Sequence, residues 1–298
     1  MIRKLFWPAA CILISAAGLF SYIHGLDTLY NARSTSAAIS APLDYRESVE
    51  IPIIMYHGLS AEEKKESDYV ITSRRFEEDL KWLAANHYTT ILPSQLISYV
   101  NSGAKLPPKP VILTFDDGYA NNYSLAFPLL QQYDAKAVIA IIGSQSDISS
   151  NDIYRDGSYG NISWGEATIM SSSGLVEFAS HTYCLHQSDK GKRKGADRLA
   201  GESFEVYRQV LLDDLSRNQA LIKQATGKEP RVFAWPYGAY PMDGCADQIL
   251  RELGFDATFT SYQHTSSVKA GVPESLYGLG RYLRTPAFDI TTIAKGHL

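Results

Sequence analysis

Short apolar stretches alternate with longer amphipathic segments along most of the chain. Many of the short stretches are rich in Val and Ile, which is typical of strands buried in a sheet. We expect strands at 50–56, 88–92, 111–115, 136–142, 175–179, 232–235, 257–261 and 279–283. The segments between them carry apolar residues at helical spacing, most clearly over 204–225, with Gly227 behind it as a stop signal.

This regular alternation of strands and helices predicts an α/β fold with a parallel sheet and crossover helices. About seven or eight such units in one chain are typical of a closed or nearly closed (β/α) barrel. We find no internal repeat and no linker to a second domain within the pattern. The pattern therefore predicts a single α/β barrel domain.

The first residues differ from the rest of the chain. Arg3 and Lys4 precede residues 5–23, which carry no charge. A positive segment followed by an apolar one is typical of a signal peptide or signal anchor, and this run is long enough to cross a bilayer. We expect residues 1–26 to form such a segment, with an uncleaved anchor slightly favoured.

Residues 27–48 are rich in serine and alanine and show no periodicity, so we expect a flexible tether there. The folded domain would then span residues 49–298. It should lie outside the cytoplasm, either anchored to the cytoplasmic membrane through the N-terminal segment or secreted to the cell envelope.

Composition limits the partners of this domain. The chain has 298 residues, is 45% hydrophobic and carries a net charge of −4. This supports a sizeable core and gives no electrostatic case for nucleic acid as a partner. We expect a monomer. Beyond Cys11 only Cys184 and Cys245 remain, and either a disulfide between them or two free thiols is compatible with the sequence.

Residues able to bind metal or transfer protons follow the predicted strands. Asp116 and Asp117 come directly after the strand at 111–115. Other such residues follow three further strands: His57, His181 with His186, and Tyr237. The carboxyl ends of the strands form one face of a (β/α) barrel, and active sites lie on that face. We therefore expect these side chains to converge.

One carboxylate and two imidazoles form a suitable ligand set for a catalytic divalent metal, because three protein ligands leave a position for water. Only one of the two adjacent aspartates can comfortably coordinate, so the other is available as a base for metal-bound water. A buried carboxylate pair also requires a cationic group nearby. The spacing of His181 and His186 alone is a weak signal, and it gains weight from Asp116 and Asp117.

Three segments resemble, in order, the central motifs of the polysaccharide deacetylases, the NodB homology group of carbohydrate esterase family 4. They are Thr114-Phe115-Asp116-Asp117-Gly118, His181-Thr182 with His186, and Trp235-Pro236-Tyr237-Gly238. The similarity covers residue 51 to the C-terminus. It implies a distorted (β/α)7 barrel, in agreement with the number of strands, and a hydrolase that removes N-acetyl groups from a polysaccharide.

The resemblance also implies roles for individual residues. Asp116 would be the general base, and the backbone N–H of Tyr237 would help to stabilise the oxyanion. The ligands of a divalent metal, Zn²⁺ as first choice with Co²⁺, Ni²⁺ or Mn²⁺ as alternatives, would be Asp117, His181 and His186. The residues that bind the substrate would be Trp235, Pro236 and Tyr237.

The sequence departs from the family pattern in three places. His186 follows His181 by five residues, where most relatives have an interval of four. Ala234 stands where most relatives have an arginine, and we expect Arg281 to orient the base instead. The usual C-terminal Leu-x-His motif is missing. His57 would replace it as proton donor to the departing amine, as though the last barrel unit had been permuted to the front.

These departures resemble the subgroup that deacetylates poly-β-1,6-N-acetylglucosamine in biofilm matrix. This polymer is the expected substrate, and peptidoglycan or chitin-like oligomers are the alternatives. A carbohydrate-binding barrel without turnover and an esterase acting on O-acetyl groups also stay open.

Overall fold

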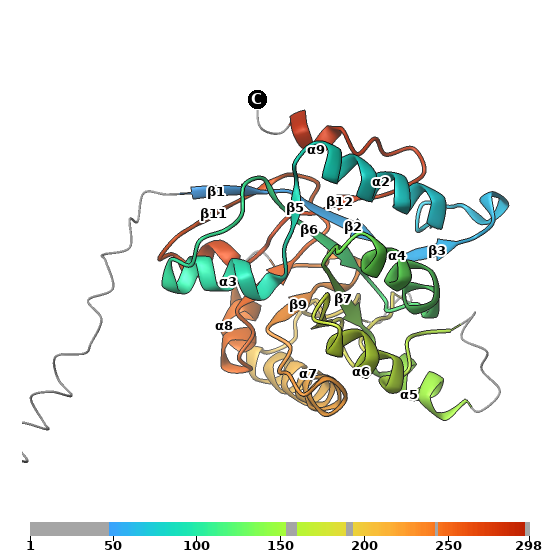
Figure 1. Ribbon diagram of the computed structural model, residues 1–298. Coiled ribbons are helices and arrows are strands. Elements are labelled where there is room, and N and C mark those ends of the chain that lie inside the picture. Colours follow the sequence, from blue (N-terminus) through green and yellow to red (C-terminus); the bar gives the residue numbers. More distant parts are fainter. Residues whose placement is uncertain (1–47, 153–159, 189–192, 242–243, 296–298) are drawn as a thin grey trace, which may run out of the picture. The chain divides into compact units, whose positions relative to one another are not determined.

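The computed structural model describes residues 48–152, 160–188, 193–241 and 244–295 (Figure 1). The predicted signal segment and all but the last residue of the predicted tether lie outside these ranges. Within them, no helix is both long and apolar enough to cross a membrane.

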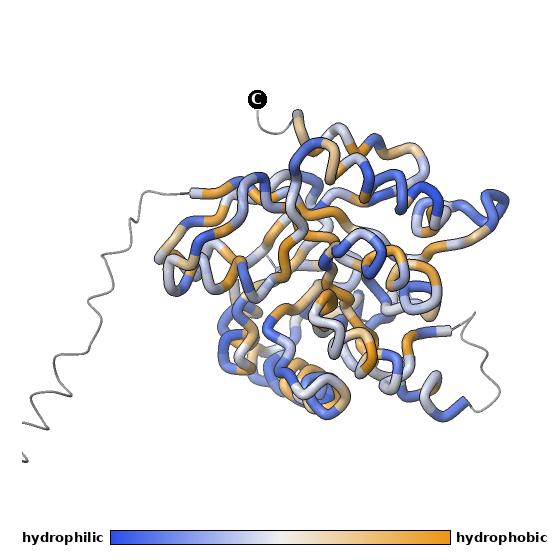
Figure 2. Tube along the Cα trace, viewed as in Figure 1, coloured by the Kyte–Doolittle hydropathy of each residue, from blue (hydrophilic) through white to orange (hydrophobic). Residues whose placement is uncertain are grey.

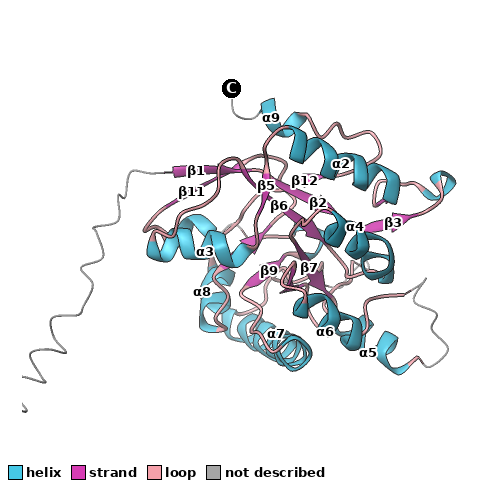
Figure 3. Ribbon diagram, viewed as in Figure 1, coloured by secondary structure: helices cyan, strands magenta, loops and turns pink. Residues whose placement is uncertain are grey.

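An eight-stranded parallel sheet forms the centre of the domain (Figure 3). The strand order is β10-β9-β8-β7-β6-β2-β12, and β5 pairs with β6 off this path. The strands are β2 (Ile53–Tyr56), β5 (Thr89–Thr90), β6 (Pro110–Phe115), β7 (Ala137–Ile141), β8 (Val176–Ser180), β9 (Val232–Ala234), β10 (Ala257–Phe259) and β12 (Tyr282–Leu283).

The two ends of the sheet meet in the segment that leads into β12. Beside β10, the Leu279 N–H donates to Thr258 O at 2.9 Å, and the Thr260 N–H donates to Leu279 O at 2.8 Å. A few residues later β12 pairs with β2. The barrel is most distorted between β8 and β9, which share one residue pair, Ser180 with Phe233. The prediction of a nearly closed barrel of the (β/α)7 type is confirmed.

Helices surround the sheet, and Figure 2 shows hydrophobic residues concentrated on the central strands. The helices are α2 (Ser73–Ala85), α3 (Pro93–Ser102), α4 (Phe127–Gln132), α5 (Gly143–Asn151), α6 (Trp164–Ser172), α7 (Phe204–Thr226), α8 (Cys245–Glu252) and α9 (Thr292–Lys295). Local sequence explains several of their ends. Ser163 and Glu166 form the capping box of α6, and Gly227, whose φ is 72°, caps the C-terminus of α7.

The alternation of side chains along β6 divides the core. Val111, Leu113 and Phe115 belong to the cluster that includes residues of α2 and α4, whereas Ile112 packs with apolar residues of the other barrel strands. A strand has a side-chain period of two, so Thr114 and Asp116 continue the face of Ile112. The sequence of β6 thus directs Asp116 towards the barrel axis.

Strand register aligns the residues that follow the strands. Tyr56 of β2 lies beside Phe115 of β6, and the Asp116 N–H donates to Tyr56 O at 2.9 Å. His57 and Asp116 are therefore neighbours at the carboxyl ends of two adjacent strands. On the other side, Ser180 ends β8 beside β7, which places His181 on the same face.

Several predicted elements differ in the structure. The single strand expected at 50–56 is broken at Pro52, and the first part, β1 (Ser48–Ile51), pairs antiparallel with β11 (Ser266–Lys269). A short parallel pair, β3 (Gly58–Ser60) and β4 (Val70–Thr72), flanks the predicted loop after His57. These elements were not predicted because each is short or largely polar.

The structure also corrects one helix prediction and decides whether Cys184 and Cys245 form a disulfide. From the sequence we expect one helix through 123–133, with Pro128 as a candidate kink. The structure instead has a π-helical turn (Asn122–Ala126) followed by α4, and Pro128 lies in the first turn of α4, where its missing N–H costs little. Cys184 and Cys245 are not joined by a disulfide, so that alternative is wrong.

Candidate active site

A cavity of about 460 Å³ opens at the carboxyl ends of the barrel strands. The predicted site residues that line it come from separate parts of the chain: His57, Asp116, Asp117, His181, His186, Trp235, Tyr237 and Arg281. Pro236 is buried and does not line the cavity. With this exception, the structure brings together every residue that the sequence placed in the site.

Asp116 and Arg281 form a buried ion pair at the bottom of this site. The guanidinium donates two parallel bonds, Nη1 to Oδ1 and Nη2 to Oδ2, both 2.7 Å long. It also donates to Thr260 O at 2.8 Å and to Thr114 Oγ1 at 3.2 Å. Burial by itself would raise the pKa of Asp116, but Arg281 and His181 hold it below its usual range. Asp116 is therefore a carboxylate at neutral pH.

Three potential metal ligands lie beside this pair. The ligand atoms of Asp117, His181 and His186 all lie within 4.8 Å of one another. Asp117 Oδ1 is 3.2 Å from His186 Nε2 and 3.5 Å from His181 Nε2. This oxygen is buried and has no hydrogen-bond partner among the described residues. An orphaned carboxylate oxygen facing two imidazoles is the environment that a cation would complete.

The tautomer of His181 supports this interpretation. His181 Nδ1 lies 2.8 Å from Ala234 O, which can only accept, so Nδ1 carries the hydrogen. In neutral His181 the Nε2 lone pair then faces the Asp117 carboxylate. A divalent ion between them would convert this repulsion into coordination. One carboxylate oxygen and two imidazole nitrogens fit Zn²⁺ and other first-row divalent ions.

The backbone is strained at all three motifs. Asp117, Thr182 and Tyr237 have φ values of 68°, 73° and 57°, and they are three of the six non-glycine residues in the left-handed region within the described chain. Such conformations cost on the order of 1–3 kcal/mol each and cluster at functional sites. Asn161 stabilises the first of them, because its Nδ2 donates to Asp117 O at 2.6 Å.

His57 directly follows β2 and lines the cavity. Asn122 Nδ2 donates to the His57 carbonyl at 2.7 Å, which fixes the backbone, and the His57 ring lies 4.9 Å from that of Tyr69. His57 Nδ1 is buried without a partner among the described residues. Burial lowers the pKa of His57, although the Asp116 and Asp117 carboxylates oppose this shift. The residue is placed for proton transfer, and its role stays a prediction.

The motif Trp235-Pro236-Tyr237-Gly238 contains both buried and exposed residues. Trp235 is fully buried, and its ring packs against Phe233 at a centroid distance of 4.8 Å. Pro236 is buried as well. Tyr237 is 41% exposed, and its hydroxyl lies 3.2 Å from His186 Nδ1. Of the three residues predicted to bind substrate, Tyr237 is the one whose side chain is exposed.

Sequence reasoning missed four other polar residues of the cavity wall. They are Tyr69, Tyr119, Ser261 and Gln263. Tyr119 directly follows Asp116-Asp117-Gly118 and could have been found from that position. Tyr69 directly precedes β4, and no local signal distinguished it.

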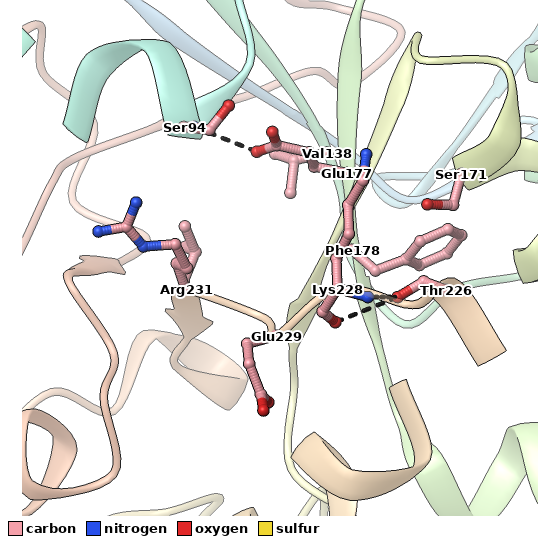
Figure 4. A pocket seen from close by; sticks show the side chains of 10 residues that line it. Ser94, Val138, Ser171, Glu177, Phe178, Thr226, Lys228, Glu229 and Arg231 are labelled. Carbon is pink, nitrogen blue, oxygen red and sulfur yellow. Dashed lines mark hydrogen bonds between the residues drawn. The ribbon is translucent and has the colours of Figure 1, made fainter. Parts of the chain in front are cut away.

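A second cavity, of about 350 Å³, lies near the amino ends of β8 and β9 (Figure 4). Three of its charged side chains have partners, among them Glu229, which pairs with Lys223. Glu177 Oε2 accepts from the Ser94 N–H at 3.1 Å, and Arg231 pairs with Asp256. None of its lining residues contributes a buried polar atom without a partner within the described chain. The unpaired polar atoms that suggest chemistry lie in the cavity at the carboxyl ends.

Comparison with known proteins identifies the family of this chain. The model of the polysaccharide deacetylase family matches residues 103–258. The poly-beta-1,6-N-acetyl-D-glucosamine N-deacetylase of Escherichia coli is 29% identical in an alignment of 262 residues that covers 81% of this chain and 38% of that protein. The chain thus spans well under half of that relative.

Two solved structures are similar over most of the chain. A de-N-acetylase from Aggregatibacter actinomycetemcomitans superposes with a TM-score of 0.70 and 28% identity, covering 83% of this chain and 100% of that one. IcaB from Ammonifex degensii gives a TM-score of 0.68 and 28% identity, covering 84% and 97%. The family model matches more than half of the chain and includes all three motifs, so this chain belongs to the polysaccharide deacetylase family.

Proposed function

We propose that this chain is a metal-dependent hydrolase that removes N-acetyl groups from N-acetylglucosamine residues of an extracellular polysaccharide. The observation that carries the proposal is the ionised Asp116, held by Arg281, beside three donors that suit a divalent ion. The names of the Escherichia coli relative and the Aggregatibacter structure support the same reaction. Poly-β-1,6-N-acetylglucosamine is the proposed polymer, because the Escherichia coli relative is named for it.

The residues of the site divide the work of amide hydrolysis. A divalent ion held by Asp117, His181 and His186 would lower the pKa of a water molecule and polarise the acetamide carbonyl. Asp116 takes the proton from the attacking water, and Arg281 keeps this carboxylate ionised and oriented. The backbone N–H of Tyr237 donates to the oxygen on which negative charge develops.

His57 completes the reaction on the leaving-group side. An amine anion is a very poor leaving group, so the nitrogen must be protonated as the carbon–nitrogen bond breaks. His57 gives this proton, and the products are acetate and a glucosamine residue. Because burial lowers the pKa of His57, its protonated form is a stronger acid than an exposed imidazolium.

Acetate release tests the proposal. The wild-type chain should release acetate faster from β-1,6-linked N-acetylglucosamine oligomers than from β-1,4-linked ones. Exhaustive chelation should abolish release, added Zn²⁺ should restore it, and His181→Ala should lose both bound metal and turnover. Full activity in a protein shown by metal analysis to be metal-free would refute the mechanism. A preference for β-1,4-linked oligomers would instead change the substrate to peptidoglycan or chitin-like polymers.

We also infer that the domain works outside the cytoplasm, either anchored to the cytoplasmic membrane or released. This rests on Arg3 and Lys4 followed by the uncharged residues 5–23. Protease added to intact cells stripped of their outer layers should digest the domain. Digestion that requires cell lysis would contradict the inference.

A further inference from the structure

We propose that the side chain of Tyr237 positions the metal ligand His186, in addition to any contact that this residue makes with substrate. The inference rests on the proposed metal-dependent function. It follows from a contrast between His181 and His186, which share a ligand role but are held in different ways.

His181 is fixed by the backbone of the barrel. It directly follows β8, and its N–H donates to Ile141 O at 3.0 Å. Its ring nitrogen Nδ1 lies 2.8 Å from Ala234 O, and the side chain is 2% exposed. Carbonyls of two strands, β7 and β9, therefore determine both the position of this residue and the orientation of its ring.

His186 lies further out, in the loop after β8. The interval of five residues from His181 carries it beyond the strand ladder, and its side chain is 20% exposed. Its Nδ1 lies 3.2 Å from Tyr237 Oη, and the two rings lie 4.6 Å apart at an angle of 40°. A side-chain hydroxyl thus does for His186 what a backbone carbonyl does for His181.

Tyr237 is well suited to this role because its own position is narrowly constrained. Its φ of 57° turns the chain sharply after β9, and the Gly238 N–H donates to Trp235 O at 3.0 Å. A Cβ at Gly238 would lie 1.8 Å from Ser261 Oγ, so the backbone at this turn packs directly against the segment after β10. The phenol is therefore presented to His186 from a rigid turn.

The chemical consequence concerns the tautomer of His186. When Tyr237 Oη accepts the hydrogen of Nδ1, the lone pair of His186 remains on Nε2, the atom that faces Asp117. Loss of the hydroxyl would free the ring to rotate and to change tautomer. Removing such a partner from a metal-ligating histidine typically weakens metal binding by about 10–100-fold.

Tyr237→Phe isolates the hydroxyl, because it keeps the ring and the backbone N–H. The measurement is the Kd for Zn²⁺ of the full chain, obtained by competition with a chromophoric chelator. We expect the Kd to rise by about 10–100-fold, and the Zn²⁺ concentration for half-maximal activity to rise by the same factor. The matched control is Tyr240→Phe, which removes a hydroxyl bonded to Asp247 at 2.9 Å close to the same turn and should leave the Kd unchanged.

The outcomes separate this inference from the proposed function. Equal Kd values for Tyr237→Phe and wild type would overturn the inference and leave the function standing. A raised KM at saturating Zn²⁺ with an unchanged Kd would also overturn it and would assign the hydroxyl to substrate binding. A wild-type chain that binds no Zn²⁺ and releases no acetate would refute the proposed function itself. Equal melting curves of both variants in chelator would show that folding is not the cause.

Discussion

Arg281 and Arg284 flank the two residues of β12 and form two ion pairs of the same kind. Arg281 donates two bonds of 2.7 Å to Asp116, and Arg284 donates bonds of 2.7 and 2.9 Å to Asp79 of α2. Both aspartates are buried. Since side chains alternate along a strand, residues three apart point to opposite faces. One arginine is directed into the barrel and the other towards the helical layer.

The two pairs differ in their surroundings. Asp116 lines the cavity, next to the three potential metal ligands, whereas Asp79 is enclosed between Arg284 and the hydroxyl of Tyr56, which donates at 3.1 Å. Burial raises the pKa of Asp79 although Arg284 and Tyr56 oppose the shift. For Asp116, the opposing charges prevail over burial. An arginine–aspartate pair therefore becomes a candidate base only where it opens onto a cavity and stays ionised.

The largest effect is expected when Asp116 is replaced. Asp116→Asn keeps the shape of the side chain but removes its ability to accept a proton from water. Because a positioned general base contributes typically about 10²–10⁴-fold, kcat should fall by a factor in that range. Bound Zn²⁺, measured by metal analysis, should be retained, since Asp117 is the proposed ligand. A kcat within tenfold of wild type would show that the pair at Asp116 is as structural as the one at Asp79.

Asp79→Asn should produce the reverse pattern. Breaking a buried ion pair leaves an uncompensated charge on Arg284 and costs about 3–5 kcal/mol of unfolding free energy. Neither Arg284 nor Tyr56 lines the cavity, so kcat per folded molecule should remain close to that of wild type. Urea unfolding and active-site titration measure the two quantities separately.

Tyr56→Phe is the milder companion of this variant. It removes one hydrogen bond to Asp79, keeps both arginine bonds, and should cost about 0.5–1.5 kcal/mol. A loss of kcat in either variant that exceeds the loss of folded protein would contradict the division between the two pairs.

This comparison also indicates which residues of the site could be predicted from the sequence. Asp116, Asp117 and His181 could be predicted because each directly follows an apolar strand, so the fold class alone places them on one face. His57 was found by the same reasoning. The contact between Asp116 and Arg281 joins residues 165 positions apart, and Arg281 was named only because a cation was required and Ala234 could not supply it.

The pair of Asp79 and Arg284 could not be predicted from the sequence in this way. Asp79 lies within an amphipathic helix next to charged residues, where an aspartate is expected to face solvent, and its partner is 205 residues away. The helix α5 was missed for a related reason. Its serine-rich sequence lacks apolar periodicity, and its first N–H groups are satisfied by Thr182 O and Tyr183 O of the loop after β8. Pairings of this kind depend on tertiary structure and not on local pattern.

The smallest effect that should distinguish the two ion pairs is a change in the pH dependence of activity in Arg281→Gln. In the wild type, Arg281 holds the pKa of Asp116 below its usual range, so the carboxylate is ionised throughout the mildly acidic range. Without the guanidinium, burial remains and favours the protonated form, so the pKa of Asp116 must rise. Since an arginine beside an aspartate lowers its pKa by about 1–3 units, the acidic limb of kcat/KM should move upward by up to that amount.

The pH dependence of kcat/KM is measured at saturating Zn²⁺. Otherwise the loss of bound metal at low pH could be mistaken for the protonation of Asp116. Arg284→Gln is the matched control. It removes the same charge from the other pair, which has no place in the reaction, and should leave the acidic limb where it is in the wild type. If both glutamine variants move the limb equally, the effect comes from a general change in the barrel. If neither moves it, Asp116 does not act as the ionised base, and the distinction between the two pairs fails.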